Sequence, residues 1–158
     1  MDCGHKEIVK LLLTTNKVDV DSKDQVFGNT PLSQAASKGD MEMVELFLAT
    51  GKVDVNSKNR DGSTPLLRAV RGGQMEVAKL LLARDDVQAN LKSNKGLTLL
   101  SEAITWTTIR KREMLELLLT TNKVDPKLKD NNGMTPLDHA KRHGWRYGMA
   151  LLERHLFT

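Results

Sequence analysis

One helix-start motif recurs four times in this chain of 158 residues. The triplet TPL occurs at 30–32, 64–66 and 135–137, and a degraded copy, TLL, occupies 98–100. The threonines stand at 30, 64, 98 and 135, at intervals of 34, 34 and 37 residues. A period of this size is the sequence signature of a repeat array, and it limits the possible folds more than composition does.

A second marker supports the same period. Leucine-rich runs begin at 11, 46, 80, 117 and 151, and a third marker, KVDV, recurs at 17–20 and 52–55, with KVDP at 123–126. The threonine-to-leucine spacing is 16 residues except after Thr98, where it is 19. The long interval therefore has one cause, three extra residues between Trp106 and Glu113.

Each repeat predicts two short helices and a loop. A threonine caps the first helix, and proline follows where its missing N–H costs nothing. Gly39 or Gly73 ends that helix, and the second helix buries a stripe such as Val44 and Phe47. Because aromatic residues are only 4% of the chain, we expect a thin aliphatic core. One helix pair cannot bury its own apolar face, so neighbouring copies must stack.

The combination of G-x-T-P-L, E-x-V/A-x-x-L-L-L and V-D-V-N resembles the ankyrin repeat. The resemblance implies an all-α fold, an ankyrin-repeat solenoid of stacked helix pairs with β-hairpin-like turns. About five units are expected in one domain over 1–158: a partial unit at 1–23, three units at 24–58, 59–92 and 93–129, and a C-terminal cap at 130–158. The 34-residue period resembles the long ankyrin arrays of fungal proteins.

Composition limits the compartment and the partners. Cys3 is the only cysteine, so no internal disulfide can form and a reducing, cytoplasmic location is expected. Neither a secretory leader nor an apolar run long enough for a membrane span is present in the sequence. The net charge is +4, and the excess of Lys and Arg over Asp and Glu lies entirely in residues 80–158.

Catalytic chemistry is not indicated. The sequence contains no phosphate-binding loop of the G-x-x-x-x-G-K-[ST] kind, and we expect no enzyme activity, cofactor or small-molecule substrate. His139 and His143 stand one helical turn apart, but only Asp138 could add a third ligand nearby. A two-ligand zinc site is not stable, so no metal is predicted.

The ankyrin resemblance implies that partners bind a concave face formed by the loop tips and the outer ends of the first helices. The positions of that face can be transferred to this chain by aligning its repeats. The predicted partner-binding residues are then Phe27, Lys38, Arg60, Arg71, Lys95, Arg142 and His143. A column of lysines at one repeat position, Lys23, Lys58, Lys92 and Lys129, would either attract an acidic partner or only solvate the surface.

The irregular fourth unit is the second candidate site. The extra residues bring Trp106 near Arg110, Lys111 and Arg112, a composition typical of binding hot spots. In register, Lys111 falls next to Trp145 and Arg112 next to Arg146. The alternative is that Trp106 folds back and covers the core where the inter-helix glycine is missing.

The sequence thus predicts a monomeric protein–protein interaction module for an acidic partner. One alternative is nucleic-acid or anionic-lipid binding through the basic C-terminal half, although +4 is a small charge for that role. Another is a scaffold fragment of a larger signalling protein.

Overall fold

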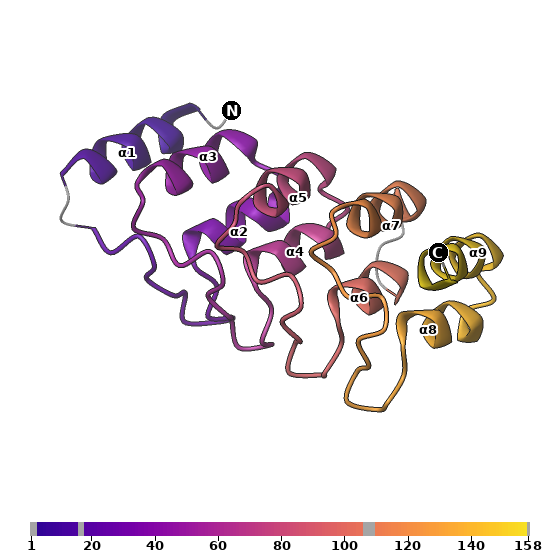
Figure 1. Cartoon of the computed structure of the whole chain (residues 1–158). Helices are drawn as coiled ribbons and strands as arrows, with labels where there is room; N and C mark the ends of the chain where they lie inside the picture. The colour runs from indigo at the N-terminus through magenta and orange to yellow at the C-terminus, as the bar shows by residue number, and fades with distance from the viewer. Residues whose placement is uncertain (1–2, 16–17, 106–109, 158) are drawn as a thin grey trace.

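The computed structural model describes residues 3–15, 18–105 and 110–157. Within these residues all regular structure is helical, and the helices form two stacked rows joined by long loops (Figure 1). The inner row contains the first helix of each repeat: α2 (Pro31–Lys38), α4 (Pro65–Arg71), α6 (Leu99–Thr105) and α8 (Pro136–Arg142). The outer row contains α1 (Cys3–Thr14), α3 (Met41–Ala49), α5 (Met75–Leu82), α7 (Lys111–Thr120) and α9 (Arg146–Phe157).

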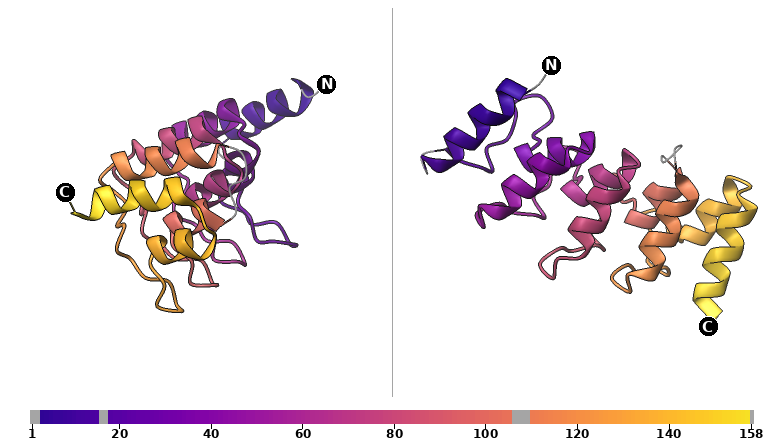
Figure 2. Two further views of the ribbon diagram at one scale, coloured as in Figure 1. Left: turned by 90° about the vertical axis from the view of Figure 1, so that its right-hand side faces the viewer. Right: turned by 90° about the horizontal axis from the view of Figure 1, so that it is seen from above.

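The array is elongated, because each helix pair packs mainly on the pairs before and after it. Seen from above, the outer helices lie side by side, and the loops of all repeats project to one side of the two rows (Figure 2). The predicted all-helical solenoid of stacked helix pairs is confirmed for the described residues. None of the helices in the described part of the chain is both long enough and apolar enough to cross a membrane.

The four repeated helix starts are structurally equivalent. Each threonine hydroxyl accepts a hydrogen bond, 3.2 Å long, from the backbone N–H three residues later. Thr98 does so although Leu99 replaces the proline, so the cap and not the proline defines the start of α6. The predicted ends of the first helices are correct in one repeat and close in the next. Gly39 ends α2 with a φ of 74°. Helix α4 ends earlier, at Arg71, and Gly73 carries the positive φ.

The core is thin and aliphatic, as predicted. Leu32, Leu66 and Leu100 are the equivalent leucines of the inner helices, and each is at most 2% exposed. In α3 the predicted stripe is buried at Val44 and Phe47, while its flanking residues Met43 and Leu48 are half-buried. Stacking of equivalent positions makes the core continuous along the array.

Polar side chains join the loops between repeats. The Asn56 side chain donates to the carbonyl of Asp86 at 2.7 Å and accepts from the N–H of Gln88 at 2.8 Å. Asn90, one repeat later, makes the same two bonds to Lys123 and Asp125. The asparagine side chain at this repeat position therefore pairs a backbone C=O and a backbone N–H in the loop of the next repeat. Helix hydrogen bonds do not pair these two groups.

The lysine column has a structural role at its first two members. The ammonium group of Lys23 donates to the carbonyl of Lys58 at 2.8 Å, and that of Lys58 donates to the carbonyl of Lys92 at 2.9 Å. These bonds join the loops of neighbouring repeats, so the two lysines have a structural role in addition to their charge.

Candidate functional site

The concave face is the surface formed by the loop tips and the exposed side of the inner helices. Most of the predicted partner-binding residues lie on it. The loop tips carry Phe27, Arg60 and Lys95, and Lys38, Arg71, Arg142 and His143 stand at the ends of inner helices. Arg110 and Arg112 lie instead at the start of the outer helix α7. Trp106 lies outside the described residues, so its predicted role stays a prediction.

The first loop tip presents two apolar side chains to solvent. Val26 is 67% exposed and Phe27 is 61% exposed. Five residues separate Asp24 from Thr30, whereas four separate Asn59 from Thr64 in the next loop. The first tip is therefore one residue longer than its successor. Such exposure is unfavourable in water, and contiguous exposed apolar side chains often mark interaction sites.

A single carboxylate fixes the conformation of this tip. Asp24 accepts hydrogen bonds from the backbone N–H groups of Phe27 at 2.6 Å, Val26 at 2.9 Å and Asn29 at 2.9 Å. These bonds, chiefly the one from Phe27, lower the pKa of Asp24 from 3.8 to about 2. The apolar pair is thus held by a loop that is ordered before any partner arrives.

The loop tips are also bonded to each other. Arg60 donates from its backbone N–H to the carbonyl of Phe27 at 2.9 Å, and from its guanidinium to the carbonyl of Val26 at 3.1 Å. Asn94 repeats this arrangement one loop later, with bonds of 2.8 and 2.7 Å to the carbonyls of Asp61 and Arg60. The first three tips therefore form one connected edge.

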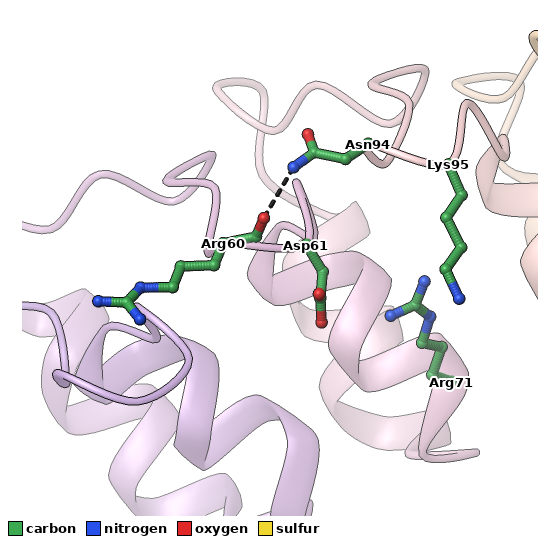
Figure 3. A pocket seen from close by; sticks show the side chains of 5 residues that line it. All are labelled: Arg60, Asp61, Arg71, Asn94 and Lys95. Atoms are coloured by element: carbon green, nitrogen blue, oxygen red, sulfur yellow. Dashed lines mark hydrogen bonds between the residues drawn. The ribbon is translucent and has the colours of Figure 1, made fainter.

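Behind the second and third tips lies a hollow of about 470 Å³, lined by polar residues (Figure 3). The lining consists of Arg60, Asp61, Arg71, Asn94 and Lys95. The structure thus brings together three of the predicted residues, Arg60, Arg71 and Lys95, around one opening. Lys38 and the pair Arg142 and His143 lie elsewhere on the concave face.

Arg71 is held by a residue that the sequence did not single out. Its Nε and Nη2 atoms donate to the two carboxylate oxygens of Glu102, at 2.8 and 2.5 Å, and Nη1 donates to the Ser63 hydroxyl at 3.1 Å. Glu102 is fully buried. The bonds to Glu102 raise the pKa of Arg71, although burial opposes this shift. Arg71 is therefore less available than a solvated arginine.

A signal for Glu102 was present in the repeat. The residue four positions after each capping threonine is polar in every copy: Gln34, Arg68, Glu102 and His139. This position lies on the inner helix toward the loops and the concave face. At Arg68 the buried Nε has no hydrogen-bond partner among the described residues. Among these four residues, Glu102 forms a charge pair with the preceding repeat, and the register of loop tips does not predict that pair.

The basic segment of α7 packs on the last helix. The ammonium of Lys111 lies 4.5 Å from the ring centre of Trp145, as register predicted. Arg112 lies over the ring of Tyr147, the residue after Arg146, at 4.1 Å from the ring centre. The Tyr147 hydroxyl donates to Glu116, which also accepts from Arg112 at 3.3 Å. These contacts stabilise the α7–α9 interface.

His139 is a structural residue. Its Nε2 lies 2.9 Å from a carboxylate oxygen of Asp130, and both side chains are nearly or fully buried. Burial alone would raise the pKa of Asp130, but hydrogen bonds from Met134 N–H, His139 and Asn132 N–H outweigh it and lower this pKa. His143 is exposed. Among the described residues, no group of three or more His, Cys, Asp and Glu side chains is placed to hold a metal ion.

Comparisons with known proteins agree with this architecture. The family model described as ankyrin repeats, three copies, matches residues 1–93. A crystal structure of an ankyrin repeat domain from Acinetobacter baumannii AYE is similar, with a TM-score of 0.81 and 31% sequence identity. The alignment covers 92% of this chain and 72% of that one. No curated protein matches the chain. The stacked helix pairs and the family match together show that this chain belongs to the ankyrin repeat family.

Proposed function

We propose that this protein binds an acidic protein segment along its concave face and catalyses no reaction. Ankyrin repeats are in general protein–protein interaction modules. The observation that carries the proposal is the ordered tip with the exposed Val26 and Phe27, which is bonded to the cationic Arg60. An apolar anchor beside a cation fits a partner that offers an apolar side chain flanked by carboxylates.

The remaining predicted residues extend this surface. Lys38, Arg142 and His143 are exposed along the same face, and they would contribute to charge complementarity more than to affinity. Arg110 is exposed at the start of α7 and would reach a partner from the side. Arg112 is 64% exposed although its guanidinium lies over Tyr147, so one face of it is available for contact. We propose one domain over 1–158, a monomeric state and a cytoplasmic location.

The charge distribution favours a protein partner over nucleic acid or an anionic lipid surface. Lys23 and Lys58 donate to backbone carbonyls, and Lys111 and Arg112 lie on aromatic rings. These four cations are engaged in contacts within the protein. The chain should therefore flow through heparin at about 150 mM salt, and retention there would favour the polyanion alternative.

Affinity capture from the native cell extract tests the proposal. The wild-type chain, a Phe27→Ser variant and a Lys79→Gln variant would serve as baits. Lys79 is exposed on the outer helix α5 and is the matched control away from the concave face. We expect a protein that wild type and Lys79→Gln capture equally and that Phe27→Ser loses. Equal capture by all three baits would contradict the concave-face proposal.

A further inference from the structure

The exposed apolar side chains gather at one end of the array. Among the described residues, seven large apolar side chains are exposed, and six of them lie in the first 27 positions: Ile8, Leu11, Leu12, Val18, Val26 and Phe27. The seventh, Phe157, is in the last helix at the opposite end. Apolar side chains that gather in this way on a water-exposed surface often mark an interaction site.

The same positions of α1 are buried in later repeats. Leu12 is 43% exposed, whereas its counterparts Leu81 in α5 and Leu118 in α7 are fully buried. Ile8 is 57% exposed, and its counterpart Met114 is fully buried. The apolar face of α1 therefore has the composition of an internal repeat interface but lacks the cover that the later repeats provide.

The missing cover is an inner helix. Each outer helix from α3 to α9 packs on the inner helix of its own repeat, whereas α1 has no such helix among the described residues (Figure 1). The inner helices also pack on one another in the order α2, α4, α6 and α8. The row of inner helices is therefore open in front of α2.

The open side of α2 confirms this position. Gln34 is exposed, whereas its counterparts Glu102 and His139 are buried. Pro31 is half-buried, and the prolines and the leucine at its position in the later inner helices are all buried. In the later repeats the preceding repeat helps to cover this side, as the bond from Arg71 to Glu102 shows.

A hollow of about 170 Å³ marks the open position. Its lining comes from α2, the residue that caps α3, and α3 itself: Pro31, Gln34, Ala35, Lys38, Asp40, Met43 and Phe47. Asp40 accepts a bond of 3.0 Å from Lys6 of α1, so α1 borders the hollow. A space of this size takes side chains from one face of a helix, and the helix itself would lie above it.

The inner row indicates the chemistry of the occupant. Three inner helices bury the same face, a leucine followed three and four residues later by alanine and a second apolar residue. These sets are Leu32, Ala35 and Ala36 in α2, Leu66, Ala69 and Val70 in α4, and Leu100, Ala103 and Ile104 in α6. A helix also pairs its own backbone groups, which an extended segment in apolar surroundings would leave unpaired.

From these observations we propose that the open end of the inner row receives a short amphipathic helix of the protein partner. Its buried face carries a leucine, an alanine and a further small apolar residue at positions i, i+3 and i+4, and it continues the row in front of α2. The inference rests on the proposed function and defines a second contact of the same partner. Phe27 stands four residues before Pro31, so the segment bound at the loop tip would lead into this helix. Lys38 at the rim is exposed and suits the acidic partner proposed above.

A stapled peptide tests the site without the natural partner. The peptide has the sequence of residues 28–39, with a hydrocarbon staple in place of Gln34 and Lys38, both exposed in α2. The staple removes most of the cost of helix nucleation. The control peptide carries Leu32→Asp and Ala36→Asp on the face that should be buried.

The expected result is a saturable shift of the amide resonances of Ile8, Leu12 and Met43 in NMR spectra. Amide exchange in α1 should slow by at least about fivefold at saturation, because the bound state protects the helix. Equal shifts with the control peptide, shifts confined to the loop tips, or no saturable shift at millimolar peptide would each overturn the proposal.

Three variants of the protein locate the contact. Leu12→Gln should weaken binding of the stapled peptide roughly tenfold, because one leucine is lost from the apolar contact. Ala35→Leu fills the hollow from α2 without changing α1, and it should weaken binding at least as much. Phe157→Gln is the matched control, because it removes an equally exposed apolar side chain at the other end of the array. Circular dichroism checks that all three variants fold. An equal effect of Phe157→Gln, or full binding by Leu12→Gln and Ala35→Leu, would overturn the site.

The natural partner distinguishes this inference from the proposed function. If a captured protein is lost by Phe27→Ser but retained at full affinity by Leu12→Gln and Ala35→Leu, the helix site is wrong and the interaction function stands. Loss with all three variants, together with saturable binding of the stapled peptide, supports both. Equal capture by wild type and Phe27→Ser contradicts the concave-face proposal, whatever the peptide titration shows.

Discussion

The Nη2 atom of Arg71 lies 2.5 Å from a carboxylate oxygen of Glu102, a residue 31 positions later in the chain. The pair joins α4 to α6, and Glu102 has no solvent contact. A buried ion pair costs desolvation energy on both sides, so the loss of one partner is more harmful than the loss of both. This pair therefore links two neighbouring repeats at the centre of the array and fixes the orientation of Arg71 beside the hollow.

Arg71→Met should destabilise the protein by about 3 kcal/mol, because it leaves the Glu102 carboxylate buried without a cation. The double variant Arg71→Met, Glu102→Leu should recover at least half of that loss. Urea unfolding of the wild type, both single variants and the double variant completes the cycle. A loss below about 0.5 kcal/mol for Arg71→Met, the size of a surface effect, would contradict this account.

Asp24 should make the first loop sensitive to acid. Its pKa is about 2 in the folded chain and 3.8 ordinarily. A lowered pKa means that the carboxylate stabilises the loop above about pH 4 and that this contribution disappears as the pH falls toward 2. NMR should show the Val26, Phe27 and Asn29 amide resonances titrating in this window.

Asp24→Asn is the control for that titration. With only one carbonyl oxygen as acceptor, the variant should show faster exchange of these amides at neutral pH and no titration between pH 4 and 2. An unchanged titration would mean that another carboxylate is responsible.

The buried His139–Asp130 pair should stabilise the last helix pair. Asp130→Asn weakens a charge-assisted bond and should cost about 1–3 kcal/mol. Thermal unfolding followed by circular dichroism measures this loss. His143→Ala, one turn away and exposed, should leave the transition unchanged, and equal effects of the two substitutions would contradict the structural assignment.

Helix α1 should open first. Ile8 is 57% exposed, Leu11 66% and Leu12 43%, so this helix buries only part of its apolar surface. Its cations Lys6 and Lys10 form ion pairs with Asp40 and Glu42, the first partly buried and the second exposed, and pairs near the surface contribute little. Amide exchange in α1 should be at least about tenfold faster than in α4 and α5. Equal protection would show that the ion pairs hold α1 as firmly as core packing does.

Arg112 should stabilise the α7–α9 contact. Arg112→Ala removes the cation over Tyr147 and should lower stability by about 0.5–1 kcal/mol. Arg110→Ala is the matched control, since Arg110 is an exposed arginine two residues earlier. Urea unfolding compares the two. Loss of partner binding by Arg112→Ala without a stability change would favour a direct binding role.

The sequence by itself determined the repeat, the starts of the inner helices and the stacked architecture. Thr30, Thr64, Thr98 and Thr135 cap equivalent helices because capping depends on residues within three positions of each other. The buried leucines follow because one helix pair cannot cover its own apolar face. Phe27 could be placed on a loop tip because it stands just before the capping Thr30 in the repeat.

Only the tertiary structure decided which charges are available on the surface. Arg71 faces Glu102, Lys23 reaches the carbonyl of Lys58, and Arg112 lies over Tyr147. Each of these contacts joins residues 31 to 35 positions apart. Register aligns the backbones of neighbouring repeats, but a long charged side chain can reach several partners there. The choice among them depends on the burial, geometry and desolvation of the packed array.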